Sequence, residues 1–291
     1  MRGWLVASHF VTDEEYLDLL LRFERAATRQ GIELVRKTNV ELAPLLGQDG
    51  PLPNSPDFVL FWCKDIQLAR HLEARGLKLF NSAEAIEASD DKAATVCALE
   101  RTGITQPRTV MVPRSDTSTT WGSTGFAKAT AAALGLPVVV KGTRGSFGSE
   151  VFLAHDVDEL VALLDMFAGN QLICQQFIAE SFGRDARVQV VGGRVVGAIE
   201  RFSETGDFRA NIDNGASYRP HSLTVEEERI AVEACDALGL DFAGVDLLFG
   251  LNGPVLCEVN SNAHSIPEMQ ECCNVNVADE IMTHIARELS A

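Results

Sequence analysis

The chain has 291 residues, 46% of them hydrophobic and 23% charged, which is typical of a soluble globular protein. Its formal net charge of −16 argues against a nucleic-acid groove or an anionic membrane surface as a partner. No apolar run approaches the ~20 residues that a membrane helix needs, and the amino end turns acidic too early for a signal peptide. Seven cysteines without a C-x-x-C pair argue against a disulfide framework, so we expect a reduced, cytoplasmic protein. The cysteines at positions 97, 174, 235 and 257 lie in apolar stretches and are predicted to be core residues.

The first part of the chain alternates strand-like and helix-like patterns. Thr12 and Glu15 form a capping-box signature for a first helix that ends before Gly31. A second helix is predicted at 67–75, and strands are predicted at 4–7, 32–36, 57–62 and 78–80. This order predicts a small, open, mostly parallel sheet. The G-x-G-x-x-G fingerprint is missing after the first strand, so a dinucleotide-binding fold is only weakly supported.

A glycine-rich stretch follows the strongest apolar strand of the middle segment. A helix at 89–101 and an extended segment at 106–112 lead to a helix at 126–134 and a buried strand that stops at Lys141. The glycines at 142, 145 and 148 let the backbone approach a ligand and present N–H groups to phosphate oxygens. Because a strand follows at 151–154 and Gly-Lys-Ser/Thr is absent, we expect a flap in a hairpin and not a Walker loop. A flexible hairpin tip with a solvated lysine fits the pattern equally well.

The last part of the chain is acidic and contains no lysine. From Gln175 onward there are 19 acidic residues and 8 arginines. Such a lobe can hold divalent cations, while lysines for a phosphate tail must come from earlier in the chain. A strand at 172–178 precedes a hairpin that turns on Gly192-Gly193, and helices are predicted at 225–238 and 277–289. Arginines in the polar loop at 201–215 suit anion binding, although a solvated loop explains each of them as well.

The most informative stretch lies between residues 243 and 260. Two apolar runs flank Gly-Leu-Asn-Gly-Pro, which predicts a β-hairpin, yet Asp246, Glu258 and Asn260 interrupt the runs. Side chains alternate along a strand, so Glu258 and Asn260 point the same way, and an odd-numbered loop places Asp246 across from Glu258. Two carboxylates at that spacing repel unless a cation or proton separates them, and oxygen-only ligands suit Mg²⁺ or Mn²⁺. The alternative is a solvent-facing strand edge that carries these charges by chance.

Together these stretches resemble the ATP-grasp superfamily and, within it, the RimK-type carboxylate–amine (glutamate) ligases. The resemblance covers nearly the whole chain and rests on motifs in the family's order: Asn81-Ser-x-Glu-Ala-Ile-Glu, Asp91-Lys92, Val-Val-Lys141 with its glycine-rich loop, Gln175-Gln-Phe-Ile178, Asp185-x-Arg187, Ile199-Glu-Arg201, Arg209-Ala-Asn211 and Asp246…Glu258-Val-Asn260. It implies an α/β protein built from α+β lobes. An amino-terminal open sheet domain (1–88) would precede a central ATP-grasp lobe (89–174) and a carboxyl-terminal lobe with the metal site (175–291).

The resemblance also implies an activity. The chain would be an ADP-forming carbon–nitrogen ligase that uses ATP and two Mg²⁺, or Mn²⁺ in their place. A substrate carboxylate would attack the γ-phosphate to give an acylphosphate, and an amine would then displace phosphate. The substrates would be an amino acid, glutamate or a relative, and the carboxylate of a small molecule, a peptide or a protein tail. We also expect a homo-oligomer, a dimer or a tetramer.

Each candidate site residue takes its role from the same resemblance. The metal ligands would be Asp246, Glu258 and Asn260, and the catalytic pair would be Arg209, which stabilises the acylphosphate and the oxyanion, with Asn211 beside it. The nucleotide would be bound by Lys92, Lys141, the flap residues Gly145, Ser146 and Gly148, the adenine linker Gln176, Phe177 and Ile178, the ribose ligand Asp185, and Arg187 and Arg201. The last two arginines fall on opposite faces of a hairpin that turns on Gly192-Gly193, so both can line the site only if that hairpin contains a bulge.

Two departures from the family pattern leave the substrate open. Gln176 stands where many relatives carry glutamate, and the loop from Ser261 to Pro267 replaces the small-Pro-Gly loop of the familiar glutamate ligases. His264 in that loop could bind substrate or act as a base, or could belong to an ordinary surface loop. Three alternatives follow: a nucleotide-binding regulatory module without turnover, a peptide-cyclising ligase of the same fold, or a carboxylate kinase.

Overall fold

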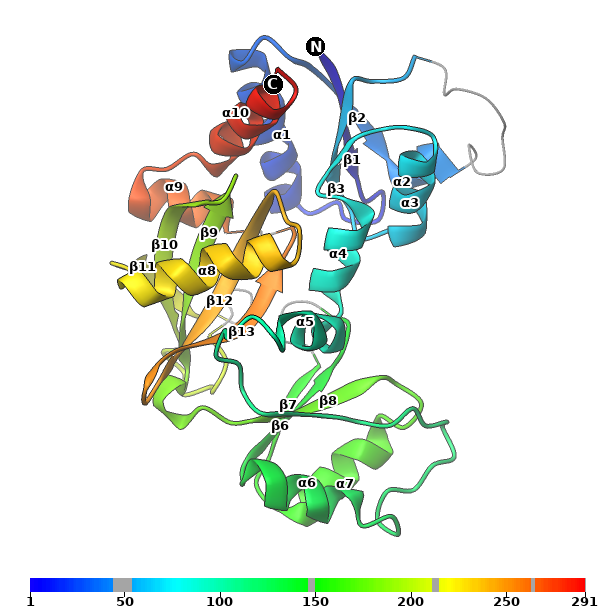
Figure 1. The fold of residues 1–291 in the computed structure, drawn as a ribbon, viewed down its shortest axis with the longest axis vertical. Helices are drawn as coiled ribbons and strands as arrows, with labels where there is room; N and C mark the ends of the chain where they lie inside the picture. The colour runs from blue at the N-terminus through cyan, green and yellow to red at the C-terminus, as the bar shows by residue number, and fades with distance from the viewer. Residues whose placement is uncertain (44–53, 146–149, 211–214, 263–264, 291) are drawn as a thin grey trace.

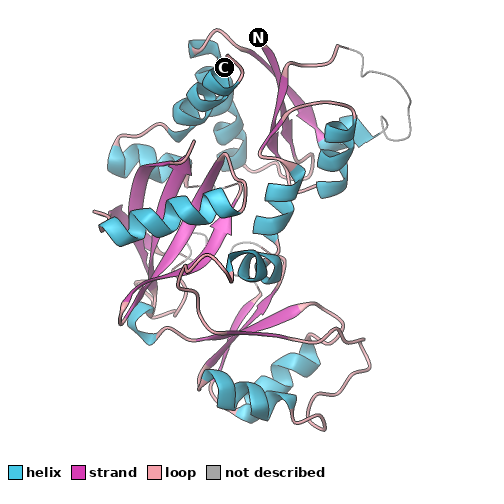
Figure 2. Ribbon diagram, in the orientation of Figure 1, coloured by secondary structure: helices cyan, strands magenta, loops and turns pink. Residues whose placement is uncertain are grey.

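The computed structural model describes residues 1–43, 54–145, 150–210, 215–262 and 265–290. Over these ranges the chain forms three β-sheets with helices packed against them (Figures 1 and 2). This mixed α/β architecture confirms the predicted fold class. None of the helices in the described ranges combines the length and the apolar character that a membrane crossing requires.

The amino-terminal sheet is parallel, as predicted. Its strand order is β2 (Glu33–Thr38), β1 (Arg2–Ala7), β3 (Phe58–Trp62) and β4 (Leu79–Phe80). Helices α1 (Glu14–Arg29), α2 (Asn39–Leu42) and α3 (Ile66–Ala74) connect these strands. Every residue of β3 is buried, because helices cover both faces of a parallel sheet. The predicted cap of α1 was wrong by one residue: the side chain of Asp13, not Thr12, accepts from the N–H of Tyr16 at 2.8 Å.

The predicted helix at 89–101 is instead two helices, α4 (Ala83–Asp90) and α5 (Lys92–Leu99). Asp91 breaks it, because its backbone is extended and its carboxylate accepts from the N–H groups of Ala93 and Ala94 at 3.0 and 3.2 Å. The break places Lys92 at the start of α5, where its own N–H donates to the carbonyl of Thr143 at 2.8 Å. Lys92 is thereby fixed next to the glycine-rich stretch.

The central sheet is antiparallel and separates a core from a cleft. Its order is β5 (Thr109–Met111), β8 (Leu172–Gln176), β6 (Val138–Gly142) and β7 (Val151–Ala154). Helices α6 (Phe126–Leu134) and α7 (Val157–Met166) cover one face, where Val138, Val140 and Cys174 are buried in their shared core. Because side chains alternate, Val139, Lys141 and Gln175 point to the other face and line the cleft.

The carboxyl-terminal sheet also separates a core from the cleft. Its order is β11 (Ser217–Pro220), β10 (Arg194–Phe202), β9 (Arg184–Val191), β12 (Phe242–Gly250) and β13 (Gly253–Asn260). Helix α8 (Val225–Ala237) packs on one face against Ala186, Val188 and Val190 of β9. The short 3₁₀ helix η2 (Ala179–Ser181) precedes β9, and helices α9 (Ile266–Cys273) and α10 (Val277–Glu288) end the chain. Strand β11 was not predicted, and the predicted loop up to Pro267 ends earlier, because α9 begins at Ile266.

The first and last parts of the chain share one hydrophobic core. Figure 1 shows α10 beside α1, and Trp62 of β3 stacks on Phe242 of β12 with ring centroids 5.7 Å apart. Asn81 reinforces this junction: its Oδ1 accepts from the N–H groups of Asp241 and Phe242, and its Nδ2 donates to the carbonyls of Phe242 and Ser261. The boundaries at 88/89 and 174/175 stay predictions, because this core runs across the first and last of the proposed domains.

We predict that Asn81→Ala strongly destabilises the fold. Asn81 is fully buried, and its loss leaves backbone groups at the start of β12 without partners. At ~1–3 kcal/mol for each unpaired buried group, the free energy of unfolding should fall by about 3 kcal/mol or more. Urea unfolding measures the change, with exposed Asn170→Ala as the control. A loss below about 1 kcal/mol would show that Asn81 does not hold the junction.

Candidate active site

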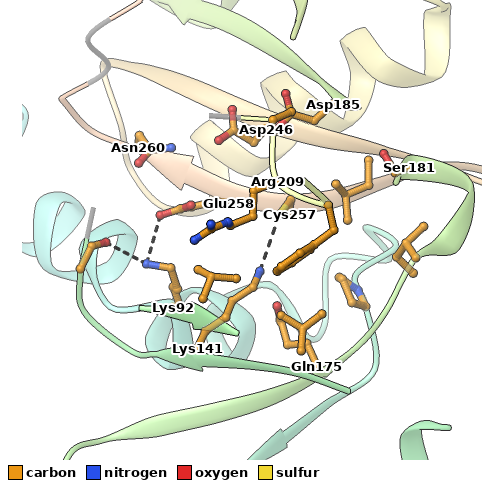
Figure 3. Close-up of a pocket in the computed structure, with 18 of the residues that line it drawn as sticks. Lys92, Lys141, Gln175, Ser181, Asp185, Arg209, Asp246, Cys257, Glu258 and Asn260 are labelled. Carbon is orange, nitrogen blue, oxygen red and sulfur yellow. Dashed lines mark hydrogen bonds and ion pairs between the residues drawn. The ribbon is translucent and has the colours of Figure 1, made fainter. Parts of the chain in front are cut away.

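A cleft with a volume of about 180 Å³ lies between the central and the carboxyl-terminal sheets. It brings together all the candidate site residues that the structure describes (Figure 3). They are Lys92, Lys141, Gly145, Gln176, Phe177, Ile178, Asp185, Arg187, Arg201, Arg209, Asp246, Glu258 and Asn260. Ser146, Gly148, Asn211 and His264 lie outside the described residues.

The predicted metal hairpin places its two carboxylates side by side. Asp246 of β12 lies directly across from Glu258 of β13. The expected reason, an odd-numbered loop, was wrong: Gly250 pairs with Gly253, so the loop holds an even number of residues. A bulge at Cys257 shifts the register by one, because Leu247 pairs with Leu256 and the next pair is Asp246 with Glu258.

A second bulge brings the two uncertain arginines to one face. The register of β9 and β10 shifts between Val195 and Gly197, and beyond that point Arg201 lies across from Asp185. Asp185 and Arg187 are two residues apart on β9 and therefore share a face. Arg187 and Arg201 both line the cleft because the hairpin contains the bulge that the sequence analysis required.

These side chains form a buried ion network of balanced charge. Arg201 donates to both oxygens of Asp185, at 2.8 and 2.7 Å, and lies 3.1 Å from Asp246. Arg187 forks onto Asp246, with Nη2 donating to Oδ2 at 2.9 Å and Nε donating to Oδ1. Burial alone would raise the pKa of Asp246, but Arg187 and Arg201 outweigh it and hold that pKa below its usual range. For Asp185 burial prevails, and its pKa is raised despite Arg201.

Two lysines face this network from the opposite side of the cleft. Lys92 Nζ lies 3.2 Å from Glu258 Oε1 and 3.1 Å from the carbonyl of Gly145. Lys141 is almost fully buried, and its Nζ lies 3.7 Å from the sulfur of Cys257. Figure 3 shows both lysine side chains pointing at the residues of β13. The ammonium groups therefore come from the central segment and the carboxylates from the last third, as the charge distribution predicted.

The donor set of the hairpin fits magnesium. Among the described residues, no group of three or more His, Cys, Asp or Glu side chains could hold a metal, so a protein cage of that kind is not available there. Mg²⁺ does not need one, because it takes one or two carboxylates and completes its shell with water and substrate phosphates. Asp246 and Glu258 would supply those carboxylates. The buried Nδ2 of Asn260 has no partner within the described chain, so the Asn260 amide can turn its oxygen to a cation.

The far end of the cleft is apolar and aromatic. Phe177 forms edge-to-face contacts with Phe182 and Phe208, at centroid distances of 6.2 and 6.3 Å. Gln176, which also lines the cleft, is bonded to Arg108: its Oε1 accepts from Arg108 Nε at 3.1 Å and its N–H donates to the Arg108 carbonyl at 2.9 Å. Such a wall suits a flat, apolar ring.

Arg209 enters the cleft from the segment after β10. Its guanidinium pairs with Asp207 at 2.8 Å, and this hydrogen bond raises the pKa of Arg209. Arg209 lines the same cleft as Glu258 and Asp246, and Figure 3 shows its side chain among theirs. A cation in this cleft can stabilise negative charge that develops there.

Several polar groups of this region were not predicted, or were predicted elsewhere. Cys257 was expected in the core but lines the cleft, because it is the bulged residue, and Cys97 is exposed. Asn262 lines the cleft as well, and Gln189 is buried two residues after Arg187. The available signal was the interruption of an apolar strand, Val188-Gln189-Val190, by a glutamine.

Comparisons with known proteins agree with this arrangement. A model of the RimK-like ATP-grasp domain matches residues 89–285. A probable alpha-L-glutamate ligase of Legionella pneumophila (strain Corby) is 31% identical over 249 residues, 84% of this chain and 78% of that protein. Beta-citrylglutamate synthase B of Mus musculus is 37% identical over 231 residues, 78% of this chain and 57% of that protein. The crystal structure of D-alanine–D-alanine ligase from Bacillus anthracis with ATP is similar in fold, with a TM-score of 0.74, 17% identity and 99% of each chain covered.

We predict that Arg201→Gln destabilises the protein in a pH-dependent way. The change leaves Asp185 and Asp246 buried with less positive charge, which should cost about 3–5 kcal/mol at neutral pH. The pKa of each carboxylate rises in the folded variant, so stability falls as pH increases through those values. The deficit relative to the unmodified protein should thus be smaller at about pH 5 than at about pH 8.

The matched control is Arg219→Gln. Arg219 also pairs with a carboxylate, Glu200, at 2.7 Å, but its side chain is 59% exposed. Its removal should cost at most about 1 kcal/mol at either pH. Denaturant unfolding of both variants at the two pH values decides the matter. Equal losses of unfolding free energy in the two variants at both pH values would contradict the stabilising role of the buried ion network.

Proposed function

The chain belongs to the RimK-like ATP-grasp family and is an ATP-dependent carboxylate–amine ligase, and we propose that its amine substrate is L-glutamate or a closely related amino acid. The acceptor is the carboxylate of a peptide or of a small polycarboxylate. The observation that carries the proposal is the cleft itself, where two lysines face two carboxylates and an amide across the gap between the two sheets. The names of the relatives support glutamate, since one is a probable glutamate ligase and another a citrylglutamate synthase.

We place the nucleotide along the floor of this cleft. The adenine ring lies against Phe177 and Ile178, and the ribose lies near Asp185. Lys92 and Lys141 bind the α- and β-phosphates, because their compact charges suit phosphate oxygens. The ion pair between Lys92 and Glu258 supports this placement. When nucleotide and magnesium bind, a phosphate can replace Glu258 as the partner of Lys92, and magnesium can replace Lys92 as the partner of Glu258. Both charges then stay compensated.

The reaction has two steps. A carboxylate oxygen of the acceptor attacks the γ-phosphorus, which forms an acylphosphate and releases ADP. The amine nitrogen then attacks the acyl carbon, expels inorganic phosphate and loses a proton, which leaves an amide. Negative charge is concentrated at the reacting groups in both steps, so the protein contributes by positioning these groups and neutralising their charge. Bound magnesium, for which we propose two ions, neutralises the β- and γ-phosphates.

The remaining roles belong to side chains of the protein. Asp246, Glu258 and Asn260 hold the ions, and Arg187 and Arg201 fix the orientation of Asp246. Arg209 stabilises the acylphosphate and the oxyanion of the second step. Asn211, which lies outside the described residues, is proposed beside it. The homo-oligomeric state and the cytoplasmic location stay predictions.

One alternative differs in its amine substrate and two in their chemistry. A peptide-cyclising ligase would use the amine of the same peptide, a carboxylate kinase would need no amine, and a regulatory module would bind nucleotide without turnover. The decisive experiment measures ADP release by the purified protein with MgATP, a panel of carboxylates that includes citrate and glutamate-ended peptides, and L-glutamate present or absent. ADP release that depends on L-glutamate, with an amide product by mass, supports the proposal. Release without any amine would point to the kinase.

We predict that Asp246→Asn and Glu258→Gln each lower turnover about a hundredfold or more, because each removes a charge that the transition state needs. Circular dichroism should show that both variants still fold, with Asp246→Asn the less stable, because Arg187 and Arg201 lose a charged partner. Asp236→Asn, the same exchange at an exposed position on α8, is the control and should retain full turnover. Near-normal turnover in either site variant would count against the metal assignment.

A further inference from the structure

The amino-terminal sheet contributes to the cleft a residue that the reaction described above does not use. Lys64 follows β3 by two positions and lines the same cleft as Lys92 and Glu258. Among the described residues that precede α5, it is the one that lines this cleft. Its side chain is 38% exposed and is therefore accessible to a ligand there.

The strand order places Lys64 where open parallel sheets bind ligands. The order β2-β1-β3-β4 reverses between β1 and β3, because the chain leaves β1 toward one edge and β3 toward the other. Helix α1 packs on the face of Leu5, and α3 packs on the opposite face with Val6. The loops after β1 and β3 therefore diverge at the carboxyl edge of the sheet, which is where such sheets form a binding crevice. Lys64 lies in the second of these loops.

The position of Lys64 is fixed by its neighbours. Its Nζ pairs with Asp90 Oδ1, at the end of α4, at a distance of 2.5 Å. The next residue, Asp65, caps the start of α3. Figure 1 shows α4 and α5 leading from the amino-terminal sheet toward the central sheet. Asp90 and Lys92 lie on either side of the break at Asp91, so Lys64 and Lys92 are held by the same short segment.

Asn262 provides a second and independent observation. It also lines the cleft and is 7% exposed, yet its Oδ1 has no hydrogen-bond partner within the described chain. Asn81, one residue after β4, donates to the carbonyl of Ser261 at 3.3 Å. Because β4 pairs with β3 in parallel, Asn262 lies near the same carboxyl edge that carries Lys64. Buried acceptors are almost always satisfied, so this oxygen calls for an N–H or O–H group from a bound molecule.

This part of the cleft lies away from the aromatic wall. Figure 3 shows Asn260 at the opposite end of the view from Ser181, which belongs to η2 beside that wall. Asn262 follows Asn260 by two residues and continues toward the amino-terminal sheet. With the nucleotide placed as above, the attacking carboxylate approaches the γ-phosphate in line, from the side away from ADP. That side is the one on which Lys64 and Asn262 line the cleft.

We propose that Lys64 is a specificity-determining residue that binds a second carboxylate of the acceptor, the one that does not react. Asn262 Oδ1 accepts from an N–H or O–H group of the same molecule. The acceptor therefore carries two carboxylates and a neighbouring donor, as a glutamate-ended peptide and a hydroxylated polycarboxylate such as citrate both do. This inference rests on the proposed function and states which acceptors the cleft selects.

The test compares two peptides that end in Ala-Glu and Ala-Gln and thus differ by one carboxylate. For the unmodified protein, kcat/KM should be about tenfold or more higher with Ala-Glu, because a charged hydrogen bond forms only there. Lys64→Met should abolish this preference, while Lys64→Arg, which keeps the charge, should retain part of it. Citrate and its symmetric monoamide form a second pair, and the pair that reacts tells a peptide from a small molecule.

Two controls accompany the test. The KM for MgATP should stay within about twofold in Lys64→Met, since the residues proposed for the nucleotide are unchanged. Lys128→Met, the same exchange at an exposed position on α6, should keep the preference of the unmodified protein. A preference that survives in Lys64→Met would overturn the proposal. So would an equal loss of turnover with both members of a pair, because a purely structural role affects both acceptors alike.

Calorimetry with Mg²⁺ and a non-hydrolysable ATP analogue separates this failure from that of the proposed function. If turnover depends on L-glutamate and Lys64→Met changes nothing, the function stands and the role of Lys64 falls. If nothing is turned over, but the Ala-Glu peptide or citrate binds and Lys64→Met abolishes that binding, only the function falls. If neither compound binds or reacts, both fall.

Discussion

The structure depends on one buried charge, the carboxylate of Asp246, and on the two arginines that compensate it. An isolated carboxylate inside a protein would be protonated or would unfold its surroundings, because its desolvation is too costly. Arg187 and Arg201 remove that cost, but only if β9, β10 and β12 present all three side chains to the same point. The requirement sets the register of the strands, the place of the cleft and the orientation of the hairpin that carries Glu258 and Asn260.

Two β-bulges meet that requirement. Strand alternation offers only two faces, and an ordinary two-residue turn at each hairpin would put Arg201 on the wrong face and Cys257, not Glu258, opposite Asp246. One extra residue in each of β10 and β13 reverses the parity. The bulge at Cys257 has the additional effect of turning a thiol toward Lys141, where burial raises the pKa of that thiol. Ligands of one site can therefore come from strands whose regular continuation would keep them apart.

Whether a feature could be predicted from the sequence depends on whether local residues or the pairing of strands determine it. The strands Phe58–Trp62 and Val138–Gly142 and the helix Phe126–Leu134 were predictable, because their apolar patterns and caps are local. The motifs also picked out residues that the structure gathers at one cleft, while the roles of these residues stay predictions. The break at Asp91 was missed although its cap is local, while the strand Ser217–Pro220 and both bulges could not be predicted, since each depends on the exact pairing of neighbouring strands. Gln189 was overlooked because a single polar residue in a strand has no meaning until its neighbours across the sheet are known.

The core shared by the two ends of the chain has a consequence for biosynthesis. Helix α1 and the first sheet pack against Phe242 and α10, which leave the ribosome more than 200 residues later than α1. Until then this apolar face of the amino-terminal sheet is covered by α1 but not by the last third of the chain, and the slow, long-range closure invites chaperone binding or aggregation. Loss of α10 would therefore leave α1 and the amino-terminal sheet of a newly made chain without one of the elements that complete their core.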